Sequence, residues 1–332
     1  MKPALASSLL EWTAHNRWIW ACVGVMMLWA ILSVVTSQFS LSSLSGVAIS
    51  SSFLVLVALG QMIVVTTGGG NIDLSIAGLM TLSAYIALIV IGGHDDRLLL
   101  GVAVTLGLGL TAGAVNASLV LISRIPAIIA TLATGYVLAT ASLLANRAIP
   151  GFAIAPTLRL VATGRVLGAP IMPIIAIAAV AAASFVINRT AYGRTLSAVG
   201  QNALAARLAG VRTARVTAVA FLASSVLAAF TGLLSGAYVG GAFLEMGQPY
   251  LLQSLGAVVL GGTLIFGGSA TAMGTLFGGI LLVLIVTTMQ IAQMPPGTQD
   301  VVEGVVIIAV LALAGGSMRR RRRTTASPPA PR

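Results

Sequence analysis

Two long stretches of this chain contain no charged residue. Residues 18–72 and residues 246–299 hold no Lys, Arg, Asp or Glu, and each stretch can hold two membrane spans of about 20 residues. Only 8% of the 332 residues are charged, whereas about 25% are charged in an ordinary soluble domain. The charge pattern therefore predicts an all-α polytopic membrane protein and excludes a water-soluble globular domain.

About ten apolar stretches are long enough to be read as transmembrane helices. We expect them over residues 18–36, 46–67, 74–92, 98–122, 126–145, 170–187, 216–236, 252–268, 271–291 and 301–317. The stretches 252–268 and 301–317 are short, and the first is rich in Gly, so either is expected to be tilted, broken or re-entrant. The resulting transmembrane domain, 18–317, lies between an N-terminal segment, 1–17, and a basic, Pro-containing tail, 318–332.

The distribution of Arg predicts the orientation in the membrane. The segment 188–215 carries five Arg and no acid, and residues 319–323 are all Arg. Cytoplasmic loops are enriched in Lys and Arg, so we expect this segment and both chain termini on the cytoplasmic side of the cell (inner) membrane. The loops 93–97 and 146–169 then lie outside, and the Arg residues of 146–169 are the one exception to the rule. Because topology explains the net charge of +11, we expect no nucleic-acid partner.

The chain lacks the residues that two kinds of site require, a zinc site and a phosphate-binding loop. The chain has two His and one Cys, too few for the usual zinc sites, and neither His lies in an expected span. No Gly-x-x-x-x-Gly-Lys-Ser/Thr phosphate loop is present, so the chain is not an ATPase of that kind. We expect no catalytic residue, no metal and no cofactor.

A shift of 196 residues aligns parts of the two halves of the chain. It places Gly60 on Gly256 and Gly78 on Gly274, and both regions consist of a span, a Gly-rich break and a second span. Transporters are often built from internal repeats, but Gly is also frequent in membrane helices. The pattern fits either a parallel internal repeat or chance.

Asp73 is the one charged residue between positions 18 and 94, and it follows a run of three Gly. A charge at the bilayer centre costs about 2.5–3.5 kcal/mol on insertion scales, but it is tolerated where a helix breaks and lines a cavity. Asp73, with Asn71 and Ser75, is therefore a candidate for the translocation path or its gate. The alternative is that Asp73 caps the next helix by accepting the backbone N–H of Ser75 or Ile76.

The Arg-rich cytoplasmic segment contains a short amphipathic pattern. Asn202 is a typical N-cap, and Gly210 is typical of the residue after a helix end. Leu204, Leu208 and Val211 are spaced at i, i+4 and i+7, which places them on one face. This pattern predicts a short helix whose apolar stripe either lies flat at the lipid headgroups or docks on a partner.

Four motifs, in order along the chain, resemble the ribose/galactose/xylose permease branch of ABC importers. Residues 66–75 resemble the branch's TSGIDLS element, residues 124–132 its RxPxFIxTL element, residues 193–211 its GR…GGNxxAAxLSGI element, and residues 257–276 its AVVLGGTSLFGG element. The motifs extend over most of the apolar part of the chain.

This resemblance implies an ABC importer permease fold in a non-catalytic subunit that forms the path for a sugar or sugar-like solute. It implies that a separate ABC ATPase subunit binds ATP and docks on the segment 188–215. It also implies that a periplasmic or extracytoplasmic solute-binding protein delivers the solute, and that a second permease copy completes the pore in the bilayer. The residues that match the docking loop are Gly193, Arg194, Asn202, Leu204, Arg207, Leu208 and Gly210.

The chain also departs from the branch's pattern. It has Ala203 where members often have Glu, and Leu251 and Gln253 where members often have acidic residues. These departures leave the solute open, and nucleosides or branched-chain amino acids are alternatives. In a different class, a proton-coupled secondary transporter would use Asp73 as an intramembrane relay.

Overall fold

The fold is a bundle of apolar helices, seen in a computed structural model that describes residues 18–36, 41–148 and 151–309. The long helices are α2 (Trp18–Thr36), α3 (Leu41–Thr66), α4 (Ile76–Ile91), α5 (Leu98–Leu121), α6 (Ala127–Arg147), α8 (Ile171–Arg189), α11 (Thr213–Val239) and α13 (Ala272–Ile291). Within the described ranges, six helices (α3, α5, α6, α8, α11 and α13) are long and apolar enough to cross a membrane, and α2 and α4 are also apolar. The expected all-α polytopic class is confirmed.

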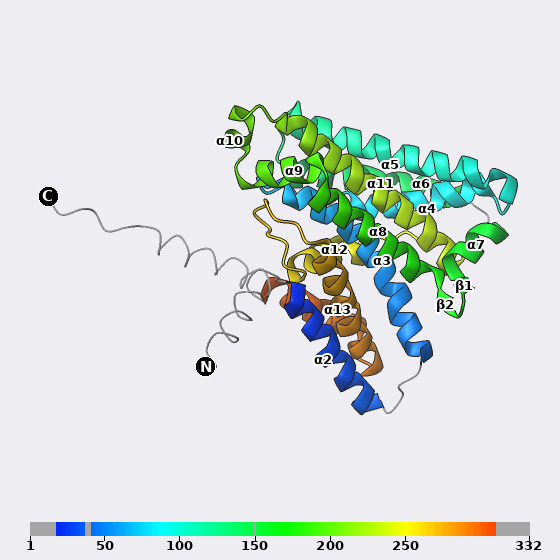
Figure 1. The fold of residues 1–332 in the computed structure, drawn as a ribbon. Helices are drawn as coiled ribbons and strands as arrows, with labels where there is room; N and C mark the ends of the chain where they lie inside the picture. Colours follow the sequence, from blue (N-terminus) through cyan, green and yellow to red (C-terminus); the bar gives the residue numbers. More distant parts are fainter. Residues whose placement is uncertain (1–17, 37–40, 149–150, 310–332) are drawn as a thin grey trace, which may run out of the picture.

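The short elements gather at the two ends of the bundle (Figure 1). At one end lie α9 (Ala191–Gln201) and α10 (Ala203–Leu208); at the other lie α7 (Pro156–Thr163) and a hairpin of β1 (Arg165–Val166) and β2 (Ala169–Pro170). The turn η1 (Asp95–Arg97) contacts α7 through a hydrogen bond, in which the Thr157 N–H donates to Asp95 Oδ1 at 3.0 Å. The loops expected on one side of the membrane are thus adjacent.

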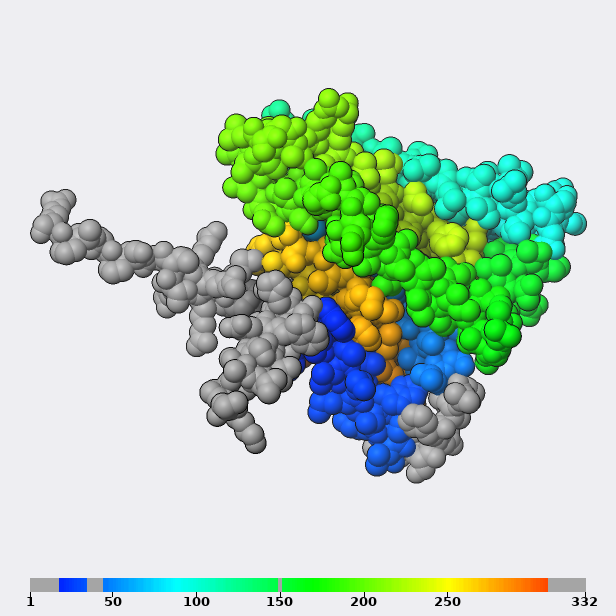
Figure 2. Space-filling model, in the orientation of Figure 1, coloured from blue at the N-terminus to red at the C-terminus, as the bar shows by residue number. Residues whose placement is uncertain are grey.

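Helices α3 and α11 form the centre of the bundle. Their apolar stretches are mostly buried, and α11 packs against α3, α4 and α5. Helices α5, α6 and α8 instead present many large apolar side chains on the outside, as lipid-facing helices do. On the flank seen in Figure 2, α2 lies along α13, with the rings of Trp18 and Phe277 stacked at 5.7 Å.

The second Gly-rich region, residues 252–268, does not form a complete membrane span. Helix α12 (Gln248–Leu260) has 13 residues, so it is about 20 Å long at a rise of about 1.5 Å per residue, short of the roughly 30 Å hydrocarbon core. The chain then leaves helical geometry until α13, with left-handed φ at Gly262, Gly267 and Gly268. The stretch 252–268 is therefore a broken helix, one of the expected forms, because Gly stabilises a helix poorly.

The remaining expectations are met only in part. Residues 296–309 are helical, so the last expected span begins earlier than position 301; its end, the N-terminal segment 1–17 and the tail 318–332 lie outside the described residues. In the segment 188–215 a single short helix was expected, but the structure has two, because α9 precedes α10.

Candidate functional site

The break between α3 and α4 is a turn made by three consecutive Gly, of which Gly68 is buried and Gly69 and Gly70 are exposed. Gly68, Gly69 and Gly70 have φ of 74°, 67° and 78°, a left-handed conformation that favours Gly because other residues carry a Cβ. Asn71 follows, and its Nδ2 donates to Thr67 Oγ1 at 2.9 Å, which closes the turn onto the end of α3. The sequence therefore breaks the helix where the run of Gly predicts.

Asp73 is held in the interior by three hydrogen bonds. Its side chain is 1% exposed; Oδ1 accepts from Ser75 N at 3.0 Å and from Ser75 Oγ at 2.6 Å, and Oδ2 accepts from Ser224 Oγ at 2.8 Å. A buried carboxylate is stabilised by donors that satisfy its lone pairs. Ser75 N is one of the donors that the capping interpretation names, but the N-cap residue of α4 is Ser75 and not Asp73, so this bond closes the turn before the helix. The bond from Ser224 ties the break to α11.

Two other helices hold the same turn. Asn116 of α5 donates from Nδ2 to Ser75 Oγ at 2.8 Å, and Thr131 of α6 accepts the Leu74 N–H at 3.0 Å. Each of these side chains is buried. The turn after α3 is thus fixed from α5, α6 and α11 together.

The partners of this turn were not predicted from the sequence. Gln61 of α3 belongs with them, because its Oε1 accepts the Asp73 N–H at 3.3 Å. One signal was available: Gln61 and Asn116 are the single carboxamide side chains of α3 and α5, and polar side chains in membrane helices usually face other helices. The missed residues are Gln61, Asn116, Thr131 and Ser224.

The segment 188–215 presents apolar side chains outward; because its motif resembles a docking loop, we call it the docking segment. Asn202 Oδ1 accepts the Ala205 N–H at 3.0 Å and so caps α10 as predicted, and Gly210 follows the helix with φ of 83°. Leu204 and Leu208 are 68% and 83% exposed. Val211, the third residue of the predicted stripe, instead packs inward.

The basic and glycine residues of the docking segment have separate roles in its geometry. Arg194 and Arg207 are exposed. Gly193 is buried, and its N–H donates to Thr190 Oγ1 at 3.3 Å. A Cβ at Gly193 would overlap the Ile187 carbonyl, so the corner between α8 and α9 needs a residue without a side chain.

The structure brings the docking segment to both Gly-rich breaks. At the end of α9, a Cβ at Gly200 would overlap the Thr66 carbonyl oxygen and the Gly268 nitrogen, and a Cβ at Gly267 would overlap Gly68. The Gly268 N–H donates to Thr66 O at 2.9 Å. In Figure 1 the loop between α12 and α13 accordingly lies beside α9. We call this contact of Gly68, Gly200, Gly267 and Gly268 the glycine junction.

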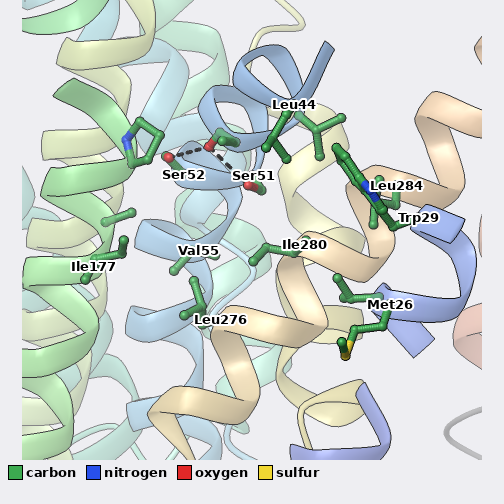
Figure 3. Close-up of a pocket in the computed structure, with 15 residues that line it drawn as sticks. Met26, Trp29, Leu44, Ser51, Ser52, Val55, Ile177, Leu276, Ile280 and Leu284 are labelled. Carbon is green, nitrogen blue, oxygen red and sulfur yellow. Dashed lines mark hydrogen bonds between the residues drawn. The ribbon is translucent and has the colours of Figure 1, made fainter. Parts of the chain in front are cut away.

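An apolar groove lies between α2, α3, α8 and α13 (Figure 3). Its volume is about 430 Å³, and its two lining hydroxyls, those of Ser51 and Ser52, both donate to the Ala48 carbonyl, at 3.1 and 2.6 Å. A hydroxylated solute would lose its water hydrogen bonds there without replacement, at a cost of about 1–3 kcal/mol per group. The groove therefore suits an apolar occupant.

Comparison with known proteins identifies the type of chain. Residues 43–311 match the family described as "Branched-chain amino acid transport system / permease component". The autoinducer 2 import system permease protein LsrC of Shigella flexneri is 30% identical over 301 residues, covering 90% of this chain and 86% of that protein. LsrC of Klebsiella pneumoniae is 32% identical over 293 residues, covering 87% and 84%.

A third relative, a probable ABC transporter permease protein of Sinorhizobium fredii, is 30% identical over 263 residues, which cover 79% of this chain and 78% of the relative. No solved structure matches the chain significantly.

Proposed function

Because this chain belongs to that family of transport-system permeases, a non-catalytic and multi-pass membrane component, we propose that it serves a binding-protein-dependent importer of a sugar-like solute in the inner membrane. A separate ATPase chain hydrolyses ATP, a solute-binding protein delivers the solute, and a second permease copy completes the path. Two observations support a sugar-like solute: relatives are named for autoinducer 2 import, and the sequence motifs resemble the sugar branch.

The exposed stripe on α10 is the observation that carries this proposal. Leu204 and Leu208 are exposed on α10, which lies at one end of the bundle (Figure 1). Burying a Leu side chain is worth about 1.5–3 kcal/mol. Arg194 of α9 and Arg207 of α10, both exposed, add positive charge to the same segment. An ATPase cleft lined by apolar and acidic side chains would match this surface.

The proposed orientation follows from the same segment. The basic residues of 188–215 favour the cytoplasmic side, which places α7, η1 and the β1–β2 hairpin outside, at the opposite end of the bundle. The solute then arrives at the α7 end, and both chain termini are cytoplasmic.

The glycine junction gives this proposal a mechanical route. A displacement of α10 by the ATPase moves α9, and α9 contacts the end of α3 and the turn at Gly268 through Gly200. Both breaks therefore receive the motion of one segment. Asp73 then anchors the first break to α11 through Ser224, so that α3, α4 and α11 move as one unit.

Substitution of Leu204 by Arg tests the docking surface. We expect Leu204→Arg to abolish co-purification of the ATPase while membrane insertion stays normal. The matched control is Leu167→Arg, because Leu167 is also exposed but lies in the β1–β2 turn at the other end. Equal co-purification of the ATPase with both variants would contradict the proposal.

Uptake measurements test the solute and the energy source. Membrane vesicles that contain the permease, the ATPase and the binding protein should accumulate D-ribose, D-xylose, D-galactose or autoinducer 2 only with ATP. Accumulation of L-leucine alone would favour the amino-acid alternative, which the printed family description suggests. Uptake that follows a proton gradient without ATP would make the chain a secondary transporter and Asp73 its relay.

A further inference from the structure

A second pocket lies at the end of the bundle opposite the docking segment. It has a volume of about 370 Å³ and is lined by Tyr85 of α4, Asn146 of α6 and residues 242–245, which follow α11. This volume falls in the range of about 300–1,000 Å³ that small-molecule sites occupy. Helix α11 begins beside the docking segment and ends at this pocket, so the pocket lies where the proposed orientation places the outer face.

The loop that carries Glu245 is fixed against α4. Gly247 lies so close to α4 that a Cβ there would overlap the Ala77 carbonyl, and its N–H donates to Thr81 Oγ1 at 3.0 Å. Ala242 and Met246 are buried in one cluster with Tyr85. The residues between these anchors, 243–245, are exposed. The loop therefore holds Phe243, Leu244 and Glu245 at the pocket by packing on both sides of them.

The carboxamide of Asn146 is oriented by Tyr85. The buried Tyr85 hydroxyl donates to Asn146 Oδ1 at 2.9 Å, and the Tyr85 ring packs against Phe152 with centroids 6.0 Å apart. With Oδ1 engaged, the Asn146 amide group is the donor that remains for a ligand. Tyr85 is thus a positioning residue, and Asn146 is the residue that would touch the ligand.

The lining offers the complementary groups that a hydroxylated solute needs. The Glu245 carboxylate accepts from hydroxyl groups and the Asn146 amide donates to them, while Phe243 and Leu244 offer apolar surface to C–H faces. Hydrogen bonds to a charged group are stronger than those between neutral groups. Among the residues that the structure describes, no Lys or Arg lines this pocket, so none of them pairs with the carboxylate of an amino acid, which Glu245 would repel.

We propose that this pocket, bounded by Asn146, Phe243 and Glu245 and ordered by Tyr85, is a contact site for a neutral polyhydroxylated solute on the permease itself. The inference rests on the proposed function and deepens it, because it adds a site in this chain to the selectivity of the binding protein. The site is open and its anchors are few, so it holds solute weakly, as a path must.

Cysteine labelling detects occupancy of the pocket directly. Cys22 is the single Cys of the chain, so Cys22→Ser with Leu244→Cys places one thiol at the pocket, and Cys22→Ser with Asp96→Cys places one on η1 as the control. A membrane-impermeant thiol reagent is applied to the permease–ATPase complex without binding protein. We expect D-ribose, D-xylose, D-galactose or autoinducer 2 to slow labelling at position 244 and to leave position 96 unchanged.

Substitutions of Glu245 and Tyr85 then test which side chains of the pocket contribute to sugar binding. In the Leu244→Cys background, Glu245→Gln should raise the half-protecting sugar concentration about tenfold, and Tyr85→Phe should raise it about fivefold. The matched controls are Asp96→Asn, an exposed acid outside the pocket, and Tyr136→Phe, an exposed Tyr on the outside of α6. Neither control should change it.

The outcomes separate this inference from the proposed function. If the importer accumulates a sugar with ATP, but no sugar protects position 244, the pocket inference is wrong and the proposed function stands. Protection by L-leucine and by no sugar also overturns the inference. If no sugar is transported, the proposed function fails, and labelling still decides whether the pocket binds polyhydroxylated compounds.

Discussion

Replacing Asp73 by Ala removes every hydrogen bond that its carboxylate accepts. The Ser75 hydroxyl still accepts from Asn116, but three donors, Ser75 N, Ser75 Oγ and Ser224 Oγ, lose their acceptor in the interior. Each buried donor left without a partner costs about 1–3 kcal/mol, so the three together should destabilise the fold by about 3–9 kcal/mol. Asp73→Asn keeps Oδ1 for Ser75, and the Ser224 hydroxyl can rotate to accept from the new amide. We expect this variant to lose about 1 kcal/mol.

Thermal unfolding of the detergent-purified chain measures this difference. Asp73→Ala should unfold at a clearly lower temperature than wild type, and Asp73→Asn should lie close to wild type. If Asp73→Ala is as stable as wild type, the hydrogen bonds do not hold the break, and the reasoning is refuted. If Asp73→Asn unfolds normally but abolishes uptake, the negative charge itself serves transport, as the path or gate hypothesis requires.

Two further predictions concern the docking segment. Gly200→Ala should lower the free energy of unfolding by about 2–4 kcal/mol, because the new Cβ overlaps the Thr66–Gly268 contact and disrupts its hydrogen bond. It should also lower the amount of solute transported per ATP hydrolysed. The control is Gly107→Ala, at an open position of α5, which should be neutral or stabilise the fold by about 0.5–1 kcal/mol. Equal coupling ratios in the two variants would contradict a role for the junction. Asn202→Ala should remove about 1 kcal/mol of cap energy from α10 and weaken ATPase binding in titrations, whereas Asn202→Asp should restore binding.

Structural features that depend on residues close together in the chain were predictable from the sequence. The long apolar runs give the spans of α2, α5 and α13 to within a residue or two, because each such run must lie in the membrane. The run of Gly at 68–70 gives the break after α3. Asn202 gives the start of α10, since a cap acts within one helical turn. The motifs gave the permease family.

Only the tertiary structure decided which residues meet. Asp73 bonds to Ser224, 151 positions away, and the glycine junction joins residues from α3, α9 and the loop after α12. Tyr85 and Asn146, which order the second pocket, carry no local signal. The physical reason lies in the membrane: lipid-facing and helix-facing surfaces are both apolar, so the periodicity that shows the buried face of a soluble helix is weak here. The sequence therefore determines where helices begin and break, and packing alone determines which of their faces touch.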